Sequence, residues 1–213
     1  MKILLVAATE LELGFLKLEN NNAAVEIETL ISGIGIASTT FSLTKELMQN
    51  KYDLAIQAGI AGSFTNDLSL GEVIFTGTDT FGDLGIEENG VFKSLFSSGF
   101  SNENDFPFTD GWLVNNHELL KKGLLKTVTG ITVNKITDDK KQVEIQRSFF
   151  TAQAESMEGA AFHYVCLQLK ISFLQIRGIS NVVGERDKSK WKMKEAISNL
   201  NKELVKIIQL ISQ

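Results

Sequence analysis

Five short clusters of polar residues and glycines in this chain contain groups that could take part in chemistry. They span Thr9 to Glu12, Ser32 to Gly35, Gly59 to Gly62, Glu155 to Ala161 and Arg177 to Asn181. Carboxylates accept protons and hydrogen bonds, and glycine lets a bound molecule come close to the backbone. Taken singly, each cluster is weak evidence, because a lone Gly-x-Gly is more often a turn and a lone Glu near a helix start is usually a favourable dipole partner. Their repetition along the chain predicts a shared ligand site.

The segments around these clusters predict the elements that position them. Continuous apolar runs, typical of strands covered on both faces, occupy Ile3 to Ala8, Val25 to Ile31, Leu54 to Ala58, Glu72 to Thr76, Thr127 to Val133 and Ile171 to Ile179. Apolar side chains recur at helical spacing over Ile36 to Leu47, Met157 to Gln168 and Met193 to Ile211. Alternating strands and helices predict an α/β fold, a sheet with helices packed on its faces. Such sheets place ligands at the carboxyl ends of their strands.

The segment from Phe81 to Gly111 has a different character. It is rich in Gly, Ser, Asn and Asp, and its phenylalanines follow no clear period. We therefore expect a long loop or irregular excursion, and loops of this length inside compact domains are usually functional or partner-facing. The chain contains no linker-like stretch, so we expect a single domain over residues 1–213.

The composition excludes several classes of protein. A formal net charge of −5 argues against a nucleic-acid binder, which needs a basic face. The sequence has no run of about 20 apolar residues, so we expect no membrane span. The apolar start is too short for a secretory signal. The single cysteine, Cys166, cannot form an internal disulfide and fits a reducing, cytoplasmic location. With two histidines and no metal-ligand spacing, we expect neither a metal site nor a cofactor.

The motifs resemble those of the nucleoside phosphorylase and nucleosidase superfamily. The matching segments, in the family's order, are Met1 to Glu12, Ser-Gly-Ile-Gly at 32–35, Ala-Gly-Ile-Ala-Gly at 58–62, Ser-Met-Glu-Gly-Ala-Ala at 156–161 and Arg-Gly-Ile-Ser-Asn at 177–181. The Glu155 cluster, followed by Ile179 to Asp187 and Trp191, is similar to the futalosine hydrolases, which remove hypoxanthine from futalosine in an alternative route to menaquinone. The resemblance implies a three-layer αβα sandwich around a mixed sheet. It also implies a homo-oligomer in which a neighbour's loop helps to close the site.

The same resemblance implies roles for two carboxylates. Glu12 stands where the family has its general base, and a carboxylate there can deprotonate water as it attacks the sugar. Glu158 stands where the family binds the ribose, and its charge can stabilise the positive charge that develops as the N-ribosidic bond breaks. The matching motifs also imply nucleoside contacts from Gly33, Ile60 and Met157. From the residues alone, Glu12 could instead be a solvated residue of a first helical turn, which is how we interpret Glu10.

Asn181 is predicted to select the base. The adenine-cleaving members of the family have Asp at this position. Hypoxanthine presents two acceptors, O6 and N7, to which an amide can donate without taking up a proton, whereas a 6-amino group would be mismatched. We therefore expect a 6-oxopurine as the leaving base, although Asn cannot act as its general acid. Ser180 and Arg177 are expected to orient Asn181 and the nearby water, with a purely structural ion pair as the alternative for Arg177.

The distribution of arginine favours water over phosphate as the attacking group. Phosphorolysis needs a site for a dianion, typically built with arginine, and the phosphorylases of the superfamily carry early arginines. Only three of the 21 basic residues here are arginine, and the first is Arg147. We therefore expect hydrolysis, with lysine as a possible substitute phosphate ligand. The Gly33 turn is then expected to approach the sugar and water rather than to cradle phosphate.

Two further residues are predicted to contact the far end of a futalosine-like substrate. Arg186 lies in a segment rich in basic residues, from Gly184 to Glu195, and is predicted to bind a carboxylate of that tail. The alternative is that this charged segment is solvated surface, as charge runs usually are. Phe106 is expected to cover the tail of the substrate, either in its own subunit or in a neighbouring one. The alternative is that Phe106 packs in the core. The alternative functions are a methylthioadenosine/adenosylhomocysteine or aminodeoxyfutalosine nucleosidase, against which Asn181 argues, and a catalytically silent nucleoside-binding protein.

Overall fold

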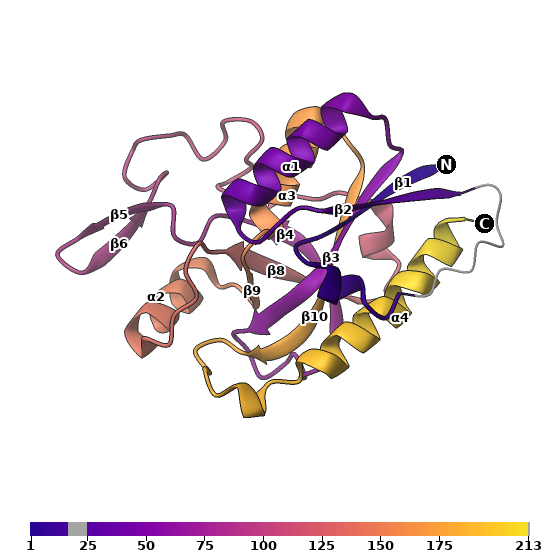
Figure 1. Cartoon of the computed structure of the whole chain (residues 1–213). Helices are drawn as coiled ribbons and strands as arrows, with labels where there is room; N and C mark the ends of the chain where they lie inside the picture. The colour runs from indigo at the N-terminus through magenta and orange to yellow at the C-terminus, as the bar shows by residue number, and fades with distance from the viewer. Residues whose placement is uncertain (17–24, 213) are drawn as a thin grey trace.

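The structure, a computed structural model, describes residues 1–16 and 25–212 (Figure 1). In this part of the chain, eight strands form one sheet and two further strands form a hairpin. The sheet contains β1 (Lys2–Ala7), β2 (Glu26–Ile31), β3 (Leu54–Ser63), β4 (Val73–Asp79), β7 (Leu113–Val114), β8 (Lys126–Thr132), β9 (Ala154–Ser156) and β10 (Phe173–Val182), and the hairpin contains β5 (Gly85–Glu88) and β6 (Val91–Ser94). The helices are α1 (Ile36–Gln49), α2 (Lys140–Phe150), α3 (Gly159–Leu169) and α4 (Met193–Ile211), with 3₁₀ turns η1 (Glu10–Leu13), η2 (Glu118–Lys121) and η3 (Lys188–Lys190).

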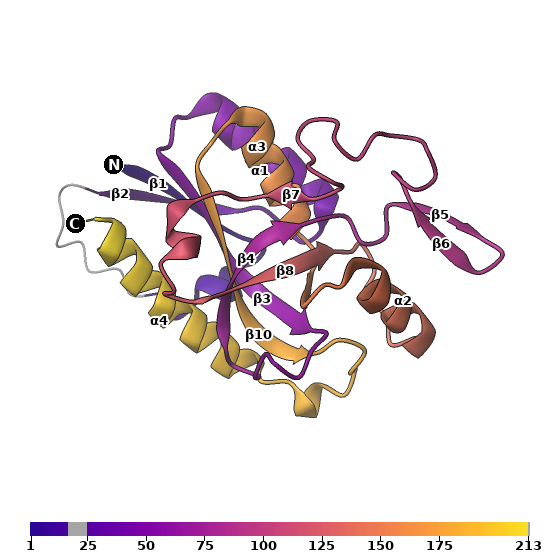
Figure 2. The same cartoon turned by 180° about the vertical axis from the view of Figure 1, so that it is seen from behind.

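The strands of the sheet close on themselves. Strand β3 pairs in parallel with β1 and β10 and antiparallel with β9. The pairings continue from β9 through β8 and β4 back to β10, so these strands form a ring from which β1 and β2 extend. Helices α1 and α3 lie together on one side and α4 lies on the other (Figures 1 and 2). The predicted α/β fold with a mixed sheet is confirmed, and the three-layer sandwich stays a prediction of the resemblance.

Two apolar clusters hold β1 and β3 between the helices. Leu200 and Leu204 of α4 pack with Leu5 and its neighbours on one face. Phe162 of α3 packs with Val6 and its neighbours on the other face. Each fully buried aliphatic or aromatic side chain contributes about 1.5–3 kcal/mol of burial free energy. Strands β1 and β3, which carry predicted motifs at their carboxyl ends, are therefore held in place by helices packed on both faces.

All six predicted strands and all three predicted helices are present, with shifted ends. One detail was wrong: β2 is not covered on both faces but is an edge strand, since among the described strands it pairs with β1 alone, and Ile31 is 40% exposed. Its charged residues Glu26 and Glu28 alternate with apolar ones, a pattern that a half-exposed edge tolerates. The predicted excursion over 81–111 contains the β5–β6 hairpin, which projects beside α2 (Figure 1). None of the helices in the described ranges is long and apolar enough to cross a bilayer.

Candidate active site

A cavity of about 280 Å³ opens at the carboxyl ends of β1, β3, β9 and β10. Six of the ten predicted site residues line it: Glu12, Ile60, Met157, Glu158, Ser180 and Asn181. The parallel pairing of β1, β3 and β10 brings segments from the start, middle and end of the chain to one edge of the sheet. The clusters found along the sequence thus meet at one place.

Glu12 is held in the turn η1, directly after β1. Its carboxylate is buried and accepts hydrogen bonds from the backbone N–H of Ile60 to Oε1 (3.1 Å) and of Thr9 to Oε2 (3.1 Å). Burial raises the pKa of Glu12, although the Arg177 charge and these two amides oppose the shift. The solvated alternative for Glu12 is therefore wrong. A fixed carboxylate with a raised pKa is suited to take a proton from water.

Helix α4 anchors the turn that carries Glu12. Asn201 is 2% exposed, and its Nδ2 donates to the backbone carbonyl of Glu12 and to that of Ile197, each at 2.7 Å. The position of the carboxylate is thus tied to the core through α4. Sequence reasoning missed Asn201, although a signal was present: it is an amide four residues after Ile197, on the apolar face of the helix.

Glu158 immediately precedes α3 and is also buried. Its Oε1 accepts a hydrogen bond from the backbone N–H of Gly35 at 2.9 Å. Gly35 has φ +89°, a left-handed conformation that favours glycine. The second glycine of the Ser-Gly-Ile-Gly turn therefore positions a carboxylate.

Arg177 lies behind the cavity rather than in its lining. The guanidinium is buried, with Nη1 3.9 Å from Oε2 of Glu158 and Nη2 donating to Oε1 of Gln57 at 2.6 Å. Gly59 makes room for it, because a Cβ there would clash with Nη1 of Arg177 and lie 2.8 Å from Oε1 of Glu12. Arg177 does form an ion pair, but with a carboxylate of the site. It therefore holds positive charge beneath the carboxylates.

Asn181 lies near the end of β10, beside Gly62 of β3. The hydroxyl of Ser180 donates to Oδ1 of Asn181 at 2.7 Å, and Nδ2 of Asn181 donates to the carbonyl of Val182 at 2.9 Å. Together these contacts fix which way the amide points. One N–H of Asn181 remains for a ligand. The orienting contact comes from Ser180 and not from Arg177.

Two predicted residues at the rim do not line the cavity. Arg186 is exposed, and its guanidinium carbon lies 5.4 Å from the centre of the Trp191 ring. Trp191 itself lines the cavity. Gly33, with φ +82°, shapes the turn before α1 and also lies outside the lining. Arg186 therefore contacts a residue that lines the cavity, Trp191, but does not line the cavity itself.

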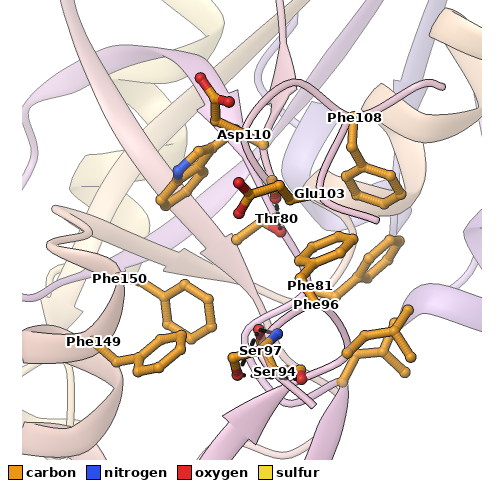
Figure 3. Close-up of a pocket in the computed structure, with 14 residues that line it drawn as sticks. Thr80, Phe81, Ser94, Phe96, Ser97, Glu103, Phe108, Asp110, Phe149 and Phe150 are labelled. Carbon is orange, nitrogen blue, oxygen red and sulfur yellow. Dashed lines mark hydrogen bonds between the residues drawn. The ribbon is translucent and has the colours of Figure 1, made fainter. Parts of the chain in front are cut away.

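The aromatic excursion forms a cavity of its own. Phe106 is 64% exposed and lies outside the lining of the Glu12 cavity, so it is not packed in the core. Figure 3 shows the second cavity, of about 260 Å³, with Phe81 and Phe108 on one side and Phe149 and Phe150 on the other. No residue of the 81–111 excursion, all of which the structure describes, lines the Glu12 cavity.

The sequence analysis included Glu155 and Gly35 in its clusters without giving either a role of its own, and it did not single out Gln57. Glu155 lines the cavity from β9, a strand of three residues that is too short to show a period. Gly35 was noticed only as part of a turn. Gln57 is an amide within an otherwise apolar run, and that contrast was the available signal of a buried polar partner.

Comparison with known proteins identifies the family. The sequence profile of the Phosphorylase superfamily matches residues 15–212. A futalosine hydrolase of Thermus thermophilus is 30% identical over 96% of this chain and 94% of that protein. A 5'-methylthioadenosine/S-adenosylhomocysteine nucleosidase of Bacillus velezensis is 29% identical over 85% of this chain and 79% of that protein. The native structure of futalosine hydrolase of Helicobacter pylori superimposes with a TM-score of 0.78 at 18% identity, covering 98% of this chain and 97% of that one.

The chain belongs to the Phosphorylase superfamily. Within that superfamily it is a hydrolase of N-glycosidic bonds, a nucleosidase, like its futalosine hydrolase and methylthioadenosine/adenosylhomocysteine nucleosidase relatives. The predicted resemblance is confirmed, and the catalytically silent alternative is disfavoured. The identity of the nucleoside does not follow from these relatives, because they include both kinds of enzyme at similar identity.

Proposed function

We propose that this enzyme hydrolyses the N-glycosidic bond of a 6-oxopurine nucleoside, with futalosine as the substrate and hypoxanthine as the leaving base. The observation that carries the proposal is the meeting of two buried carboxylates, Glu12 and Glu158, with the amide of Asn181 in one cavity. The similarity to the futalosine hydrolase of Thermus thermophilus supports it.

The proposed reaction uses the two carboxylates at the sugar. Glu158 accepts hydrogen bonds from the ribose hydroxyls and opposes the positive charge that grows as the bond between the anomeric carbon and the base nitrogen breaks. Glu12 takes a proton from water while the water oxygen bonds to the anomeric carbon. The departing base keeps the electron pair of the broken bond and takes a proton from a second water, because the Asn181 amide is no acid. The hydroxide that remains takes the proton from Glu12 and restores its carboxylate. The products are free base and a sugar with an anomeric hydroxyl.

The charge of the cavity favours water over phosphate. Among the described residues that line it there is no lysine or arginine. Arg177 lies beneath the cavity, where it forms an ion pair with Glu158 and a hydrogen bond with Gln57. A phosphate dianion would therefore meet the carboxyl groups of Glu12, Glu155 and Glu158 without a compensating cation in the lining. Neutral water carries no such penalty.

We further propose that Trp191 and Arg186 recognise the substrate tail at the rim. Trp191 offers an aromatic face, and the Arg186 charge beside it could meet a carboxylate. A homo-oligomer whose neighbouring excursion, including Phe106, covers this rim belongs to the same proposal. Sedimentation equilibrium of the purified chain tests the oligomer: a monomer at assay concentration would remove that part.

Base release from matched substrates tests the proposed substrate. Futalosine and its 6-amino counterpart should be compared at equal concentration, along with methylthioadenosine, in buffers with and without phosphate. We expect hypoxanthine release from futalosine, a much smaller adenine release, and no dependence on phosphate. Preferential adenine release would establish the methylthioadenosine/adenosylhomocysteine or aminodeoxyfutalosine nucleosidase alternative, and a requirement for phosphate would establish phosphorolysis.

Two neighbouring glutamates provide a matched pair of variants. Glu12→Gln keeps the shape of the buried side chain but removes the base, so we expect a large loss of kcat; general-base catalysis typically contributes about 100- to 10,000-fold. Glu10→Gln changes an exposed residue of the same turn and should leave kcat near the wild-type value. Near-normal turnover of the Glu12 variant would show that another group is the base.

A further inference from the structure

A third carboxylate, Glu155, lies in the same cavity and has no part in the reaction described above. Its side chain is 6% exposed and contributes to the cavity lining from β9. Within the part of the chain that the structure describes, its Oε2 is buried without a hydrogen-bond partner. A buried oxygen of this kind costs free energy unless something satisfies it. A ligand of the cavity is the available candidate.

The sheet register places Glu155 and Asn181 on either side of one glycine. Gly62 of β3 pairs with Glu155 of β9 on one side and with Asn181 of β10 on the other. Cross-strand neighbours project from the same face of a sheet, and adjacent strands are about 4.8 Å apart. Glu155 and Asn181 are therefore about 10 Å apart across Gly62. A Cβ at Gly62 would lie 2.9 Å from Cγ2 of Val183 and 3.3 Å from Nδ2 of Asn181, so a larger residue there would crowd the Asn181 amide. Both side chains line the cavity, so a planar base bound between them would meet a polar group at each end.

We propose that Glu155 is a specificity-determining residue that accepts a hydrogen bond from N1–H of a bound 6-oxopurine, while the free N–H of Asn181 donates to the O6 and N7 edge. The inference rests on the proposed function and deepens it. Asn181 alone offers one N–H to the base, because its other N–H is bound to Val182. A donor at one end and an acceptor at the other match the acceptor O6 and the donor N1–H of hypoxanthine.

A 6-aminopurine fits this pair less well. Its N1 carries a lone pair and no hydrogen, so that an ionised Glu155 would face it with like partial charge. Oδ1 of Asn181 already accepts from Ser180, and its N–H cannot serve a 6-amino group. Sites with mismatched buried polar groups discriminate by orders of magnitude. Glu155 thus adds a second point of discrimination at the base.

The charges around Glu155 set the pH at which it can accept this bond. Burial raises the pKa of Glu155 to about 7; the negative charge of Asp83 raises it further and the positive charge of Arg186 lowers it. Asp79 and Arg177 line the narrow space beneath it. Below pH 7 the protonated carboxyl loses its acceptor charge. Hypoxanthine binding should therefore strengthen as pH rises through 7, and Asp83→Asn should shift this transition to lower pH.

Calorimetric binding of free bases tests the inference without requiring hydrolysis. Wild-type enzyme at pH 8 is titrated with hypoxanthine, with 1-methylhypoxanthine, which lacks N1–H, and with adenine. We expect hypoxanthine to bind about 10- to 100-fold more tightly than the methylated base, the range expected for a hydrogen bond to a charged group. Glu155→Ala should weaken the binding of hypoxanthine by the same factor and abolish the preference for hypoxanthine over 1-methylhypoxanthine. Glu155→Gln, which keeps the side-chain volume, separates loss of charge from loss of packing.

Asp79→Asn is the matched control. Asp79 is also a buried carboxyl whose pKa burial raises to about 7, but it lies outside the cavity and is hydrogen-bonded to Thr132 and Gln175. Its substitution should leave the ratio between the two bases unchanged. An equal effect of both substitutions would mean that Glu155 acts only through stability or general charge, and would overturn the inference.

The outcomes separate the inference from the proposed function. If futalosine is cleaved but N1 methylation has no effect on base binding, the proposed function stands and the role of Glu155 falls. If N1–H is required for base binding but futalosine is not cleaved, the role of Glu155 is supported and futalosine is ruled out as the substrate. Tighter binding of adenine than of hypoxanthine, lost in Glu155→Ala, would mean that this carboxylate binds a 6-amino group, and would overturn both.

Discussion

Replacing Gly59 by alanine tests whether catalysis depends on the close approach of two charged groups to β3. The new Cβ would clash with Nη1 of Arg177 and lie 2.8 Å from Oε1 of Glu12. Arg177 has little room to retreat, because it is fully enclosed and its Nη2 is bound to Gln57 at 2.6 Å. Overpacking of this kind costs about 1–3 kcal/mol, or roughly 2–12 °C in Tm for a chain of this size. A shift of about 1 Å in a catalytic group lowers the rate roughly 100-fold.

The assay compares kcat/KM for base release with Tm from thermal unfolding. Gly77→Ala is the control: a Cβ there would lie 2.6 Å from Cγ2 of Thr127, so that β4 is similarly overpacked, but away from the cavity. We expect both variants to lose comparable stability and only Gly59→Ala to lose about two orders of magnitude in kcat/KM. Full activity in Gly59→Ala, or parallel losses in the two folded variants, would refute the reasoning.

Three further predictions follow from buried or rim contacts. Burial raises the pKa of Asp79 from 3.8 to about 7, so the folded state holds its proton more tightly than the unfolded state and stability falls as pH rises between these values. Asp79→Asn should remove up to about 1.4 kcal/mol per pH unit of that fall, as measured by urea unfolding across this range. Asn201→Ala should lower kcat by releasing the turn that carries the general base, whereas Asn199→Ala, which removes the hydrogen bond from α4 to Gly71, should lower stability alone. Equal kcat in these two variants would contradict the positioning role. Arg186→Ala should raise KM for futalosine but not for inosine, and equal effects on both substrates would rule out tail recognition.

Much of the fold could be predicted because its strands and helices carry local signals. The apolar run before Thr9 and the three- and four-residue spacing of Met193 to Ile211 each correspond to an observed element, β1 and α4. Strand β9 and helix α2 were missed for local reasons as well. The first has three residues and cannot show a period. The second has an apolar face that includes Val143 and Phe150, but Phe150 is the one residue of α2 that is buried, and Lys, Gln and Glu make up much of its sequence. Strands β3 and β10 continue into Gly, Ser and Asn residues of low strand propensity because they pair with each other there.

The sequence by itself determined the class of fold, the order of the motifs and the side chains available for chemistry. Tertiary structure alone decided which of them meet. Gly35 binds Glu158 across 123 residues, and Asn201 binds the carbonyl of Glu12 across 189. It also decided that the carboxylate of Glu12 is buried and that Glu155 and Asn181 pair with Gly62 from its two sides. Periodicity reports only which neighbours along the chain share a face, whereas burial, pKa and hydrogen-bond partners depend on groups brought together from distant segments when the strands close into a ring.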